Sequence, residues 1–170
     1  MNFLLFQIVI SCVWFFTSCV VDFVAIPTVF RELHALEGGV IWGGQIGVNL
    51  FRQFNMLEIF WAFLLLAVTF FNNEWTSKLG KIKNILVGFL FIIAILYTFY
   101  LSPHITAAHK IIMTPGILPG GIDAASGELD FFHRAYVSVE KIKVLGLLAL
   151  IIFQGISWKR VLKNGGAKVC

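Results

Sequence analysis

The sequence predicts an all-α integral membrane protein, a four-helix bundle with short interfacial helices and a long or broken second helix. Hydrophobic residues make up 59% of the 170-residue chain and charged residues only 13%, with a mean hydropathy of +0.89. This composition is typical of membrane proteins rather than of soluble domains. Apolar stretches of about 20 residues, the length needed to cross a bilayer, follow one another and use up nearly the whole chain.

We expect one four-span transmembrane domain, residues 1–158, followed by a short basic cytoplasmic tail, residues 159–170. Proline, glycine and charged residues interrupt the apolar stretches and set the expected boundaries. The expected spans are about 3–26, 40–71, 84–101 and 131–157.

The first span contains one carboxylate, Asp22, and is followed by Pro27. Proline disfavours helical geometry in the residue before it, so the span is expected to end there. Asp22 lies near the far end of the span, where it either reaches the headgroup level or meets a partner inside the bundle. In residues 28–36 apolar positions recur at helical spacing between charged ones, which indicates a short helix lying in the interface.

The second span is too long for a simple crossing. A continuous helix over residues 38–71 would extend about 50 Å, against a hydrocarbon core of about 30 Å. The helix must therefore tilt strongly, break or extend beyond the bilayer. Arg52, Gln53 and Asn55 interrupt the apolar run, so a break is expected near residues 51–55.

Glycines recur every fourth residue at the start of this span, at Gly39, Gly43 and Gly47. Small residues at this spacing let another helix backbone approach closely. The pattern predicts a helix-packing face. It does not say whether the partner helix belongs to the same chain or to a second copy.

The third span has few polar groups and is expected to face lipid along much of its length. Residues 102–129 form the longest connection and contain Pro103, Pro115, Pro119 and several glycines. Within it, residues 105–113 fit a short interfacial helix, and the remainder is expected to be loop.

The last span carries a stripe of polar side chains in its first half. His133, Tyr136, Glu140 and Lys143 fall within one sector of about 80° on a helix, and leucine, isoleucine and valine cover the rest. A charge near the bilayer centre costs about 2.5–3.5 kcal/mol, so the stripe requires partners from another helix.

The second span supplies candidate partners for this stripe. At about 1.5 Å per residue, Glu58 lies at a depth that suits pairing with Lys143. Arg52 is the corresponding candidate partner for Glu140. The sequence therefore predicts an intramembrane polar network made of Arg52, Asn55, Glu58, His133, Tyr136, Glu140 and Lys143.

The distribution of basic residues sets the expected orientation. Lysine and arginine concentrate in the connection after the second span and in the C-terminal tail, whereas the two opposite connections clearly hold only Arg31 and Lys110. By the positive-inside rule both termini are cytoplasmic, in the plasma membrane or, for a bacterial protein, the inner membrane. All four histidines then lie on the outer half: His34, His104, His109 and His133.

Several short motifs stand out along the chain: Val29-Phe30-Arg31 after a proline, the glycine-rich run leading to Phe51, the segment SPHITAA at 102–108, and Phe132-His133 at the opening of the last span. Together, over about residues 12–155, they resemble the transmembrane protein 205-like family. The resemblance implies a four-span domain of unassigned function. That family's last helix has Ser and Asn where this chain has Tyr136 and Glu140, so a charged group here replaces an amide.

Three hypotheses address the polar interior. In the first, it fixes helix packing in a structural or assembly component of a membrane complex, in contact with the lipid bilayer and with further copies or other membrane proteins. In the second, it carries a proton or small solute, because transporters place ionisable groups near the midplane beside broken helices. In the third, the outer histidines form a metal or haem site, with Glu37 or Asp130 as oxygen ligands and copper or haem as the bound group.

Enzymatic function and nucleic-acid binding have little support. The sequence contains no Gly-x-Ser-x-Gly elbow, phosphate-binding glycine loop, Cys-x-x-Cys pair or His-Glu-x-x-His helix. The basic residues flank membrane spans rather than lining a soluble face. The cysteines, Cys12, Cys19 and Cys170, offer no paired extracellular framework, and no cofactor is predicted.

Overall fold

The chain folds into antiparallel helical rods in a computed structural model that describes residues 3–34, 39–72, 77–114 and 119–166. The described helices form four rods. The first rod is α1 (Phe3–Val20), η1 (Val21–Ala25) and α2 (Ile26–His34); the second is α3 (Gly39–Asn72); the third is α4 (Lys78–Leu96), η3 (Tyr97–Leu101) and α5 (Ser102–Ile112); the fourth is α6 (Pro119–Gly166).

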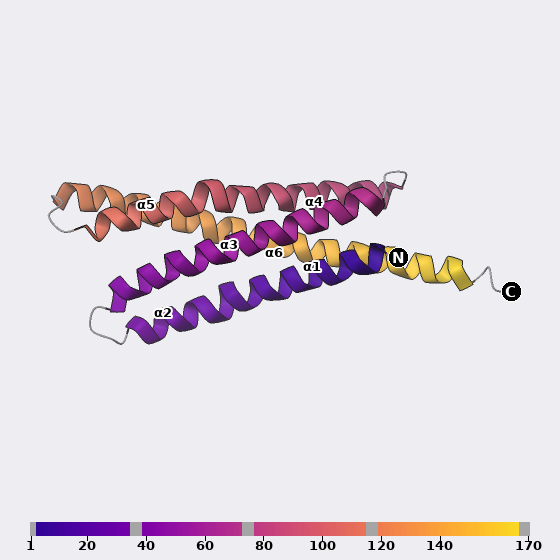
Figure 1. Cartoon of the computed structure of the whole chain (residues 1–170), viewed down its shortest axis with the longest axis horizontal. Coiled ribbons are helices and arrows are strands. Elements are labelled where there is room, and N and C mark those ends of the chain that lie inside the picture. The colour runs from indigo at the N-terminus through magenta and orange to yellow at the C-terminus, as the bar shows by residue number, and fades with distance from the viewer. Residues whose placement is uncertain (1–2, 35–38, 73–76, 115–118, 167–170) are drawn as a thin grey trace.

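The rods run up and down alternately (Figure 1). The connections from α2 to α3 and from α5 to α6 lie at one end of the molecule, which we call the far end. The N-terminus, the C-terminus and the connection from α3 to α4 lie at the other end, the termini end. The all-α fold class is therefore confirmed.

Pro27 and Pro103 do not end their helices, which corrects two predicted boundaries. A proline within a helix lacks an N–H, and its ring clashes with the carbonyl four residues earlier. Here the helix widens into one π-helical turn just before each proline, η1 and η3. The N–H of Ile26 donates to the carbonyl of Val21, and that of Ser102 donates to the carbonyl of Tyr97. The widened turn absorbs the misfit, and the helix continues.

The short interfacial helices predicted at residues 28–36 and 105–113 are therefore continuations of long rods. α2 prolongs the first rod and α5 prolongs the third. α6 likewise begins at Pro119, so residues 119–129, predicted to be loop, belong to a helix. Proline suits this first position because its missing N–H would have no helical acceptor there. α6 also continues to Gly166, past the predicted domain end at residue 158.

The break predicted in the second span is wrong. α3 is continuous over 34 residues and is about 51 Å long, so the alternative of a long helix holds. Its polar residues are tolerated without a break because they either turn into the bundle or lie on an exposed face. Asn55 and Glu58 are buried, whereas Arg52 and Gln53 are exposed.

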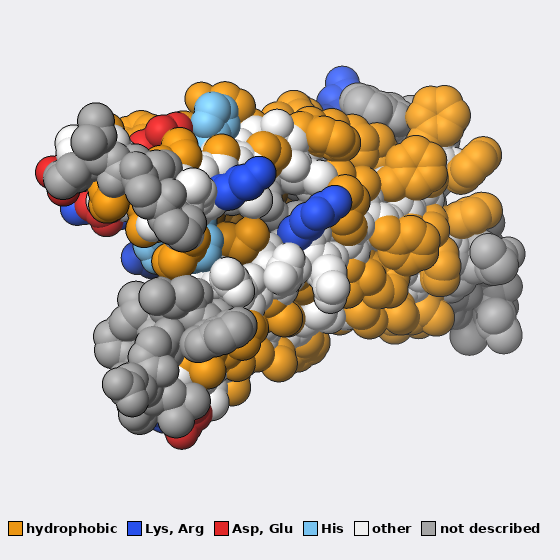
Figure 2. Space-filling model, turned by 60° about the vertical axis from the view of Figure 1, so that its left-hand side comes forward, with side chains coloured by type: hydrophobic (Ala, Val, Ile, Leu, Met, Phe, Trp, Pro, Cys, Tyr) orange, Lys and Arg blue, Asp and Glu red, His pale blue; other side chains and the backbone are white. Residues whose placement is uncertain are grey.

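Three of the rods contain a segment long and apolar enough to cross a membrane: Phe3–Leu33, Gly44–Asn72 and Lys78–Ile112. α6, which contains the predicted span 131–157, is not among them. Large apolar side chains cover much of the face shown in Figure 2, while charged and histidine side chains gather toward the far end. Phe16 is 63% exposed, Phe63 62% and Phe99 69%. Soluble monomers rarely expose apolar surface on this scale.

The buried core has two parts along the bundle. The part nearer the termini end joins all four rods, through Trp14, Leu65, Leu90 and Leu147 with their neighbours. The other part lies farther along and is rich in aromatic rings; it consists of Ile93, Tyr97, Leu101, Phe132 and Tyr136. Glu58, Glu140 and Lys143 are buried where these two parts meet, whereas Lys83 is buried near the termini end, in the second turn of α4.

Candidate functional site

Lys143 is the centre of a charged group inside the bundle. Its side chain is completely buried, and its ammonium forms ion pairs with Glu58 of α3 and with Glu140, 2.7 Å away and one helical turn earlier on α6. The ammonium also lies 5.1 Å from the ring centre of Tyr97 and 5.5 Å from that of Phe54, within range of cation–π attraction. A buried ammonium needs such partners to offset its lost hydration.

Glu58 is held by the first rod as well as by Lys143. The indole Nε1 of Trp14 and the hydroxyl of Ser18 each donate to Glu58 Oε1 at 3.0 Å. Trp14 and Ser18 are four residues apart, so they project from the same face of α1. One oxygen of Glu58 thus has three donors, while Oε2 has no hydrogen-bond partner among the described residues.

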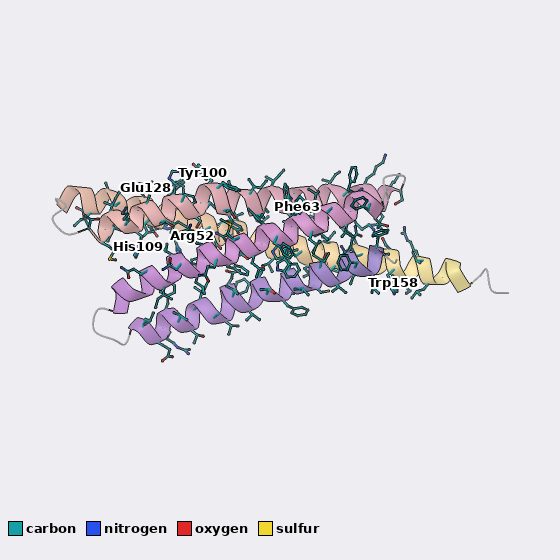
Figure 3. All side chains as sticks on the ribbon, in the orientation of Figure 1. Arg52, Phe63, Tyr100, His109, Glu128 and Trp158 are labelled. Atoms are coloured by element: carbon teal, nitrogen blue, oxygen red, sulfur yellow. The ribbon has the colours of Figure 1, made fainter. Side chains whose placement is uncertain are left out.

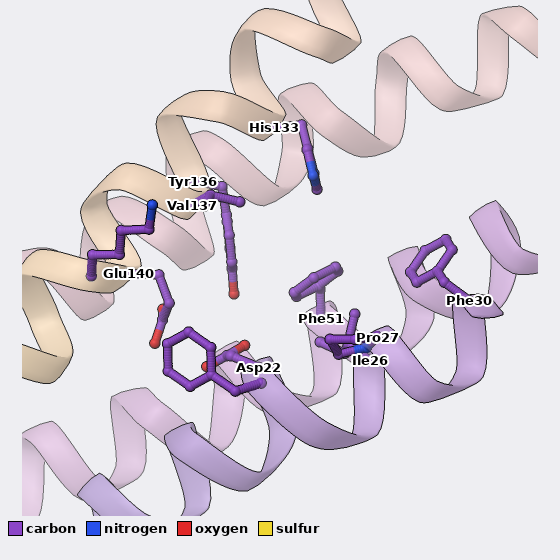
Figure 4. A pocket seen from close by; sticks show the side chains of 11 residues that line it. Asp22, Ile26, Pro27, Phe30, Phe51, His133, Tyr136, Val137 and Glu140 are labelled. Atoms are coloured by element: carbon purple, nitrogen blue, oxygen red, sulfur yellow. The ribbon is translucent and has the colours of Figure 1, made fainter.

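Asp22 continues this face, four residues after Ser18, and lies in η1. Both of its carboxylate oxygens are buried and have no hydrogen-bond partner in the described part of the chain. Figure 4 shows its carboxylate and that of Glu140 pointing toward each other. We call Asp22, Glu58, Glu140 and Lys143 the carboxylate–lysine cluster. It contains three carboxyl groups and one buried ammonium.

A layer of aromatic and amide groups lies beside the cluster. The hydroxyl of Tyr136 donates to Asn55 Oδ1 at 3.2 Å, and the hydroxyl of Tyr97 donates to the carbonyl of Tyr136 at 3.5 Å. The Tyr136 ring packs against the rings of Tyr97 and Phe51, with centres 4.6 and 4.8 Å apart. Thr98 adds a hydrogen bond to the carbonyl of Asn55 at 3.3 Å.

A cavity of about 310 Å³ reaches the cluster between the first rod, α3 and α6 (Figure 4). We call it the polar cavity. Asp22 and Glu140 line it together with aromatic side chains and His133. An adjoining cavity of about 350 Å³ shares Phe30, Phe51 and His133 with it and continues to residues of α5 and to the first turns of α6. Both cavities therefore lie on the far-end side of Lys143.

Hydrogen-bonded amides and apolar residues fill the bundle on the other side of Lys143. The amide of Gln7 donates to Thr69 Oγ1 at 2.9 Å, and that of Gln154 donates to Ser11 Oγ at 3.0 Å. These groups lie among the core residues nearest the termini end, including Leu65. Buried apolar side chains from all four rods pack together in this half of the described bundle.

The structure brings some predicted network residues together and separates others. Glu58, Glu140 and Lys143 form the cluster, Asn55 and Tyr136 lie beside it, and His133 is exposed at the cavity. The expected pair of Arg52 with Glu140 is not formed. Arg52 is exposed on α3 toward the far end (Figure 3) and lines a different cavity with Lys110. Depth along the membrane suited that pair, but the two side chains project from different faces.

The sequence placed Asp22 either at the headgroup level or inside the bundle. It did not identify Trp14, Ser18 or Tyr97 as site residues. The spacing of residues 14, 18 and 22 was a usable signal, since it places one indole, one hydroxyl and one carboxyl on a single face. Tyr97 carried no such signal.

The candidate metal ligands are dispersed. His104 Nδ1 lies 3.6 Å from Glu128 Oε1, and its ring stacks on Phe132. His109 lies against α3, His133 borders the cavities, and His34 ends α2. Among the described residues, no three His, Cys, Asp or Glu side chains gather closely enough to hold a metal ion. Glu37 lies outside the described residues.

Asp130, the other candidate oxygen ligand, has a different partner. Its carboxylate accepts a hydrogen bond from Arg134 Nε at 3.1 Å and a second one from Nη2. The guanidinium holds the pKa of the Asp130 carboxyl below its usual range. This pair is exposed near the far end and takes no part in the cluster.

The glycine-rich face of α3 packs against helices of the same chain at the two positions where its surroundings are described. A Cβ on Gly47 would lie 2.8 Å from Cζ of Phe30 on α2, and a Cβ on Gly44 would overlap the His109 ring on α5. Gly39 and Gly43 belong to the first turns of α3. Close packing at Gly44 and Gly47 thus serves the monomer fold.

Comparison with protein-family models, with curated proteins and with solved structures gave no match.

Proposed function

We propose that this chain is a four-span integral membrane protein that carries protons or a small cation, loaded from the far end at the carboxylate–lysine cluster. The observation that supports it is the imbalance of charge at a cavity. Lys143 balances one of the three carboxyl groups, and the facing pair Asp22 and Glu140 is left beside the polar cavity. Two ionised carboxylates cannot face each other out of water, so a proton or another cation belongs there.

The position of the cluster supports this function as well. Counted from the termini end, Glu58 lies 14 residues before the last residue of α3, a distance of about 21 Å along the helix. That depth falls within a hydrocarbon core of about 30 Å. Ionisable groups at such depths that face a cavity are how membrane transporters build ion sites. Release to the opposite side requires a second arrangement of the packed half near the termini end.

The proposal includes α6 as the fourth span, because its apolar half packs into the same core as the three candidate spans. Both termini are then cytoplasmic, on the side where basic residues concentrate. Membership of the transmembrane protein 205-like family and assembly into a homo-oligomer or with other membrane proteins remain part of the proposal. They rest on the sequence motifs and on the exposed apolar surface.

A structural role is the second candidate, and the ion pair of Lys143 with Glu58 favours it. That pair joins α6 to α3, and its hydrogen bonds to Trp14 and Ser18 add the first rod. Such a network would fix helix register in a structural or assembly component without any solute. It does not account for the carboxyl groups of Asp22 and Glu140, which face each other beside a cavity.

Proton flux into liposomes separates the two candidates. Purified protein is reconstituted with a trapped pH-sensitive dye, and a potassium diffusion potential drives protons inward. We expect Glu140→Gln to lower the flux about tenfold or more, which corresponds to about 1.4 kcal/mol of lost interaction. Glu128→Gln is the matched control, because Glu128 is an exposed glutamate on the same helix, and it should keep the wild-type rate.

Equal fluxes in Glu140→Gln and wild type would contradict the transport proposal. A wild-type protein without flux, whose melting temperature falls in Glu140→Gln and not in Glu128→Gln, would instead support the structural candidate. The melting temperature is therefore measured for all three proteins in the same detergent.

A further inference from the structure

We propose that the polar cavity binds a small organic cation, an ammonium group on an apolar body, and that binding releases a proton held between Asp22 and Glu140. This inference rests on the proposed function, since it names the chemical class of ion that the carboxylate–lysine cluster receives. Three features of the cavity support it: the carboxyl groups at its base, the aromatic residues of its walls and its opening toward the far end.

The base of the cavity carries two carboxyl groups whose charge Lys143 balances only in part. Glu140 is only 4% exposed, and its Oε2 has no hydrogen-bond partner among the described residues. Both oxygens of Asp22 are likewise buried without a partner there. The two carboxyl groups point toward each other beside the cavity (Figure 4). A shared proton neutralises one of the two carboxylates when the cavity is empty, and a cation can take its place.

The walls are aromatic rather than polar. Phe23, Phe30, Phe51 and Tyr136 contribute rings around the cavity. Aromatic faces attract ammonium groups and provide the apolar contact that an alkylammonium needs. Calcium and magnesium are poor candidates, because they take about six or more oxygen ligands and these walls supply few. The volume of about 310 Å³ matches the lower range of small-molecule sites.

Lys143 does not neutralise this pair fully, because Glu58 shares its ammonium. That ammonium pairs with both Glu58 and Glu140 through one oxygen of each, which leaves Glu140 Oε2 and Asp22 for another cation. The other titratable groups around the pair come from every neighbouring rod. They are Cys19 of α1, Glu58 of α3, Tyr97 of η3, and His133, Tyr136, Lys141 and Lys143 of α6.

Access is from the far end. The adjoining cavity shares Phe30, Phe51 and His133 with the polar cavity and extends between α3, α5 and α6. The core around Leu65 and Leu147 fills the described bundle on the opposite side of Lys143. Through the adjoining cavity, a cation from the far end reaches Asp22 past the three shared residues.

Titration calorimetry on the purified full-length protein in detergent tests the inference, with choline as the probe. Choline carries no proton on its nitrogen, so any proton released comes from the protein. Repeating the titration in two buffers of different ionisation enthalpy counts the protons released. The neutral analogue 3,3-dimethylbutan-1-ol, which has the same shape without the charge, is titrated in parallel.

Wild-type protein is expected to bind choline with release of up to one proton, and to bind the neutral analogue at least about tenfold more weakly. Asp22→Asn should weaken choline binding about tenfold or more and abolish proton release. Its fold should persist, because asparagine has nearly the same size as aspartate and its amide can donate a hydrogen bond toward Glu140 in place of the shared proton. Asp123→Asn, an exposed aspartate on α6, should bind like wild type.

Three results would overturn the inference: no heat of choline binding at millimolar concentration, equal binding of the neutral analogue, or undiminished binding by Asp22→Asn with an unchanged melting temperature. The outcome is distinguishable from that of the proposed function. If proton flux depends on Glu140 but choline does not bind, the proposed function holds and only binding of an organic cation is ruled out.

Discussion

At the scale of single residues, Lys143 has the largest expected effect on stability. Burying an ammonium costs several kcal/mol, and good geometry with paired anions is needed to offset that cost. Here two carboxylates and two aromatic rings surround the ammonium. Removing the lysine leaves those carboxylates in the interior without their cation.

Lys143→Met is therefore expected to lower the free energy of unfolding by about 3–5 kcal/mol. Denaturant-induced unfolding in mixed micelles, followed by circular dichroism, measures the change. Lys141→Met is the matched control, because Lys141 is an exposed lysine two residues earlier, and it should change stability by about 0.5 kcal/mol or less. Adding Glu58→Gln to Lys143→Met should recover part of the loss, and equal losses from both single lysine variants would refute the argument.

Helical spacing led from the sequence to most of the cluster. The polar stripe pointed to Glu140 and Lys143, and their charge required partners such as Glu58. The partner of Glu140 was misassigned to Arg52 because depth along a helix does not define which face a residue occupies. Asp22 was left between the headgroup level and the bundle interior, although its four-residue spacing from Ser18 already placed it on the same face of the helix as Trp14 and Ser18.

At the scale of elements, the prolines show where local rules and tertiary structure differ. Pro27 and Pro103 satisfy the sequence criteria for helix ends, yet both lie inside long rods. In a bilayer, a chain that left the helix would expose polar backbone groups to lipid, which costs several kcal/mol per group. A π-helical turn leaves fewer backbone polar groups without a hydrogen-bond partner, so the rods continue as helices. The apolar run of the second span contains no proline, and α3 is a continuous helix there.

The close contact of α3 with α5 at Gly44 gives a prediction at this scale. Gly44→Ala should destabilise the protein by about 1–3 kcal/mol, because the new Cβ overlaps the His109 ring. Thermal unfolding in detergent measures the effect. Gly88→Ala on α4 is the control: nothing lies near its Cβ, so higher helix propensity should leave stability unchanged or raise it by up to about 1 kcal/mol.

If the His109 ring causes the loss of stability in Gly44→Ala, the effects of substitutions at Gly44 and His109 on stability must be coupled. In a His109→Ala background the ring is gone, so Gly44→Ala should cost little. If the cost of Gly44→Ala were the same with and without the His109 ring, the contact would not be its cause.

At the scale of the whole molecule, the rods are longer than a bilayer is thick. The three candidate spans contain 31, 29 and 35 residues, and α6 contains 48, which is about 72 Å. Composition and apolar length were enough to predict an all-α bundle whose helices include three that are long and apolar enough to cross a membrane. The extension at the far end was not predictable, because the glycine-rich sequence that follows Pro119 has low helix propensity, and α5 and α6 are helical there while they pack together.

Cysteine labelling of the protein in sealed membranes tests whether α6 is the fourth span. On a background without Cys12, Cys19 and Cys170, Thr114→Cys at the far end and Lys163→Cys near the termini end are treated with an impermeant maleimide from each side. Four spans place the two positions on opposite sides, with Lys163→Cys labelled only from the cytoplasmic side. Three spans would leave α6 outside the bilayer and both positions labelled from one side. Both variants change exposed residues, so a difference in labelling reports topology rather than misfolding.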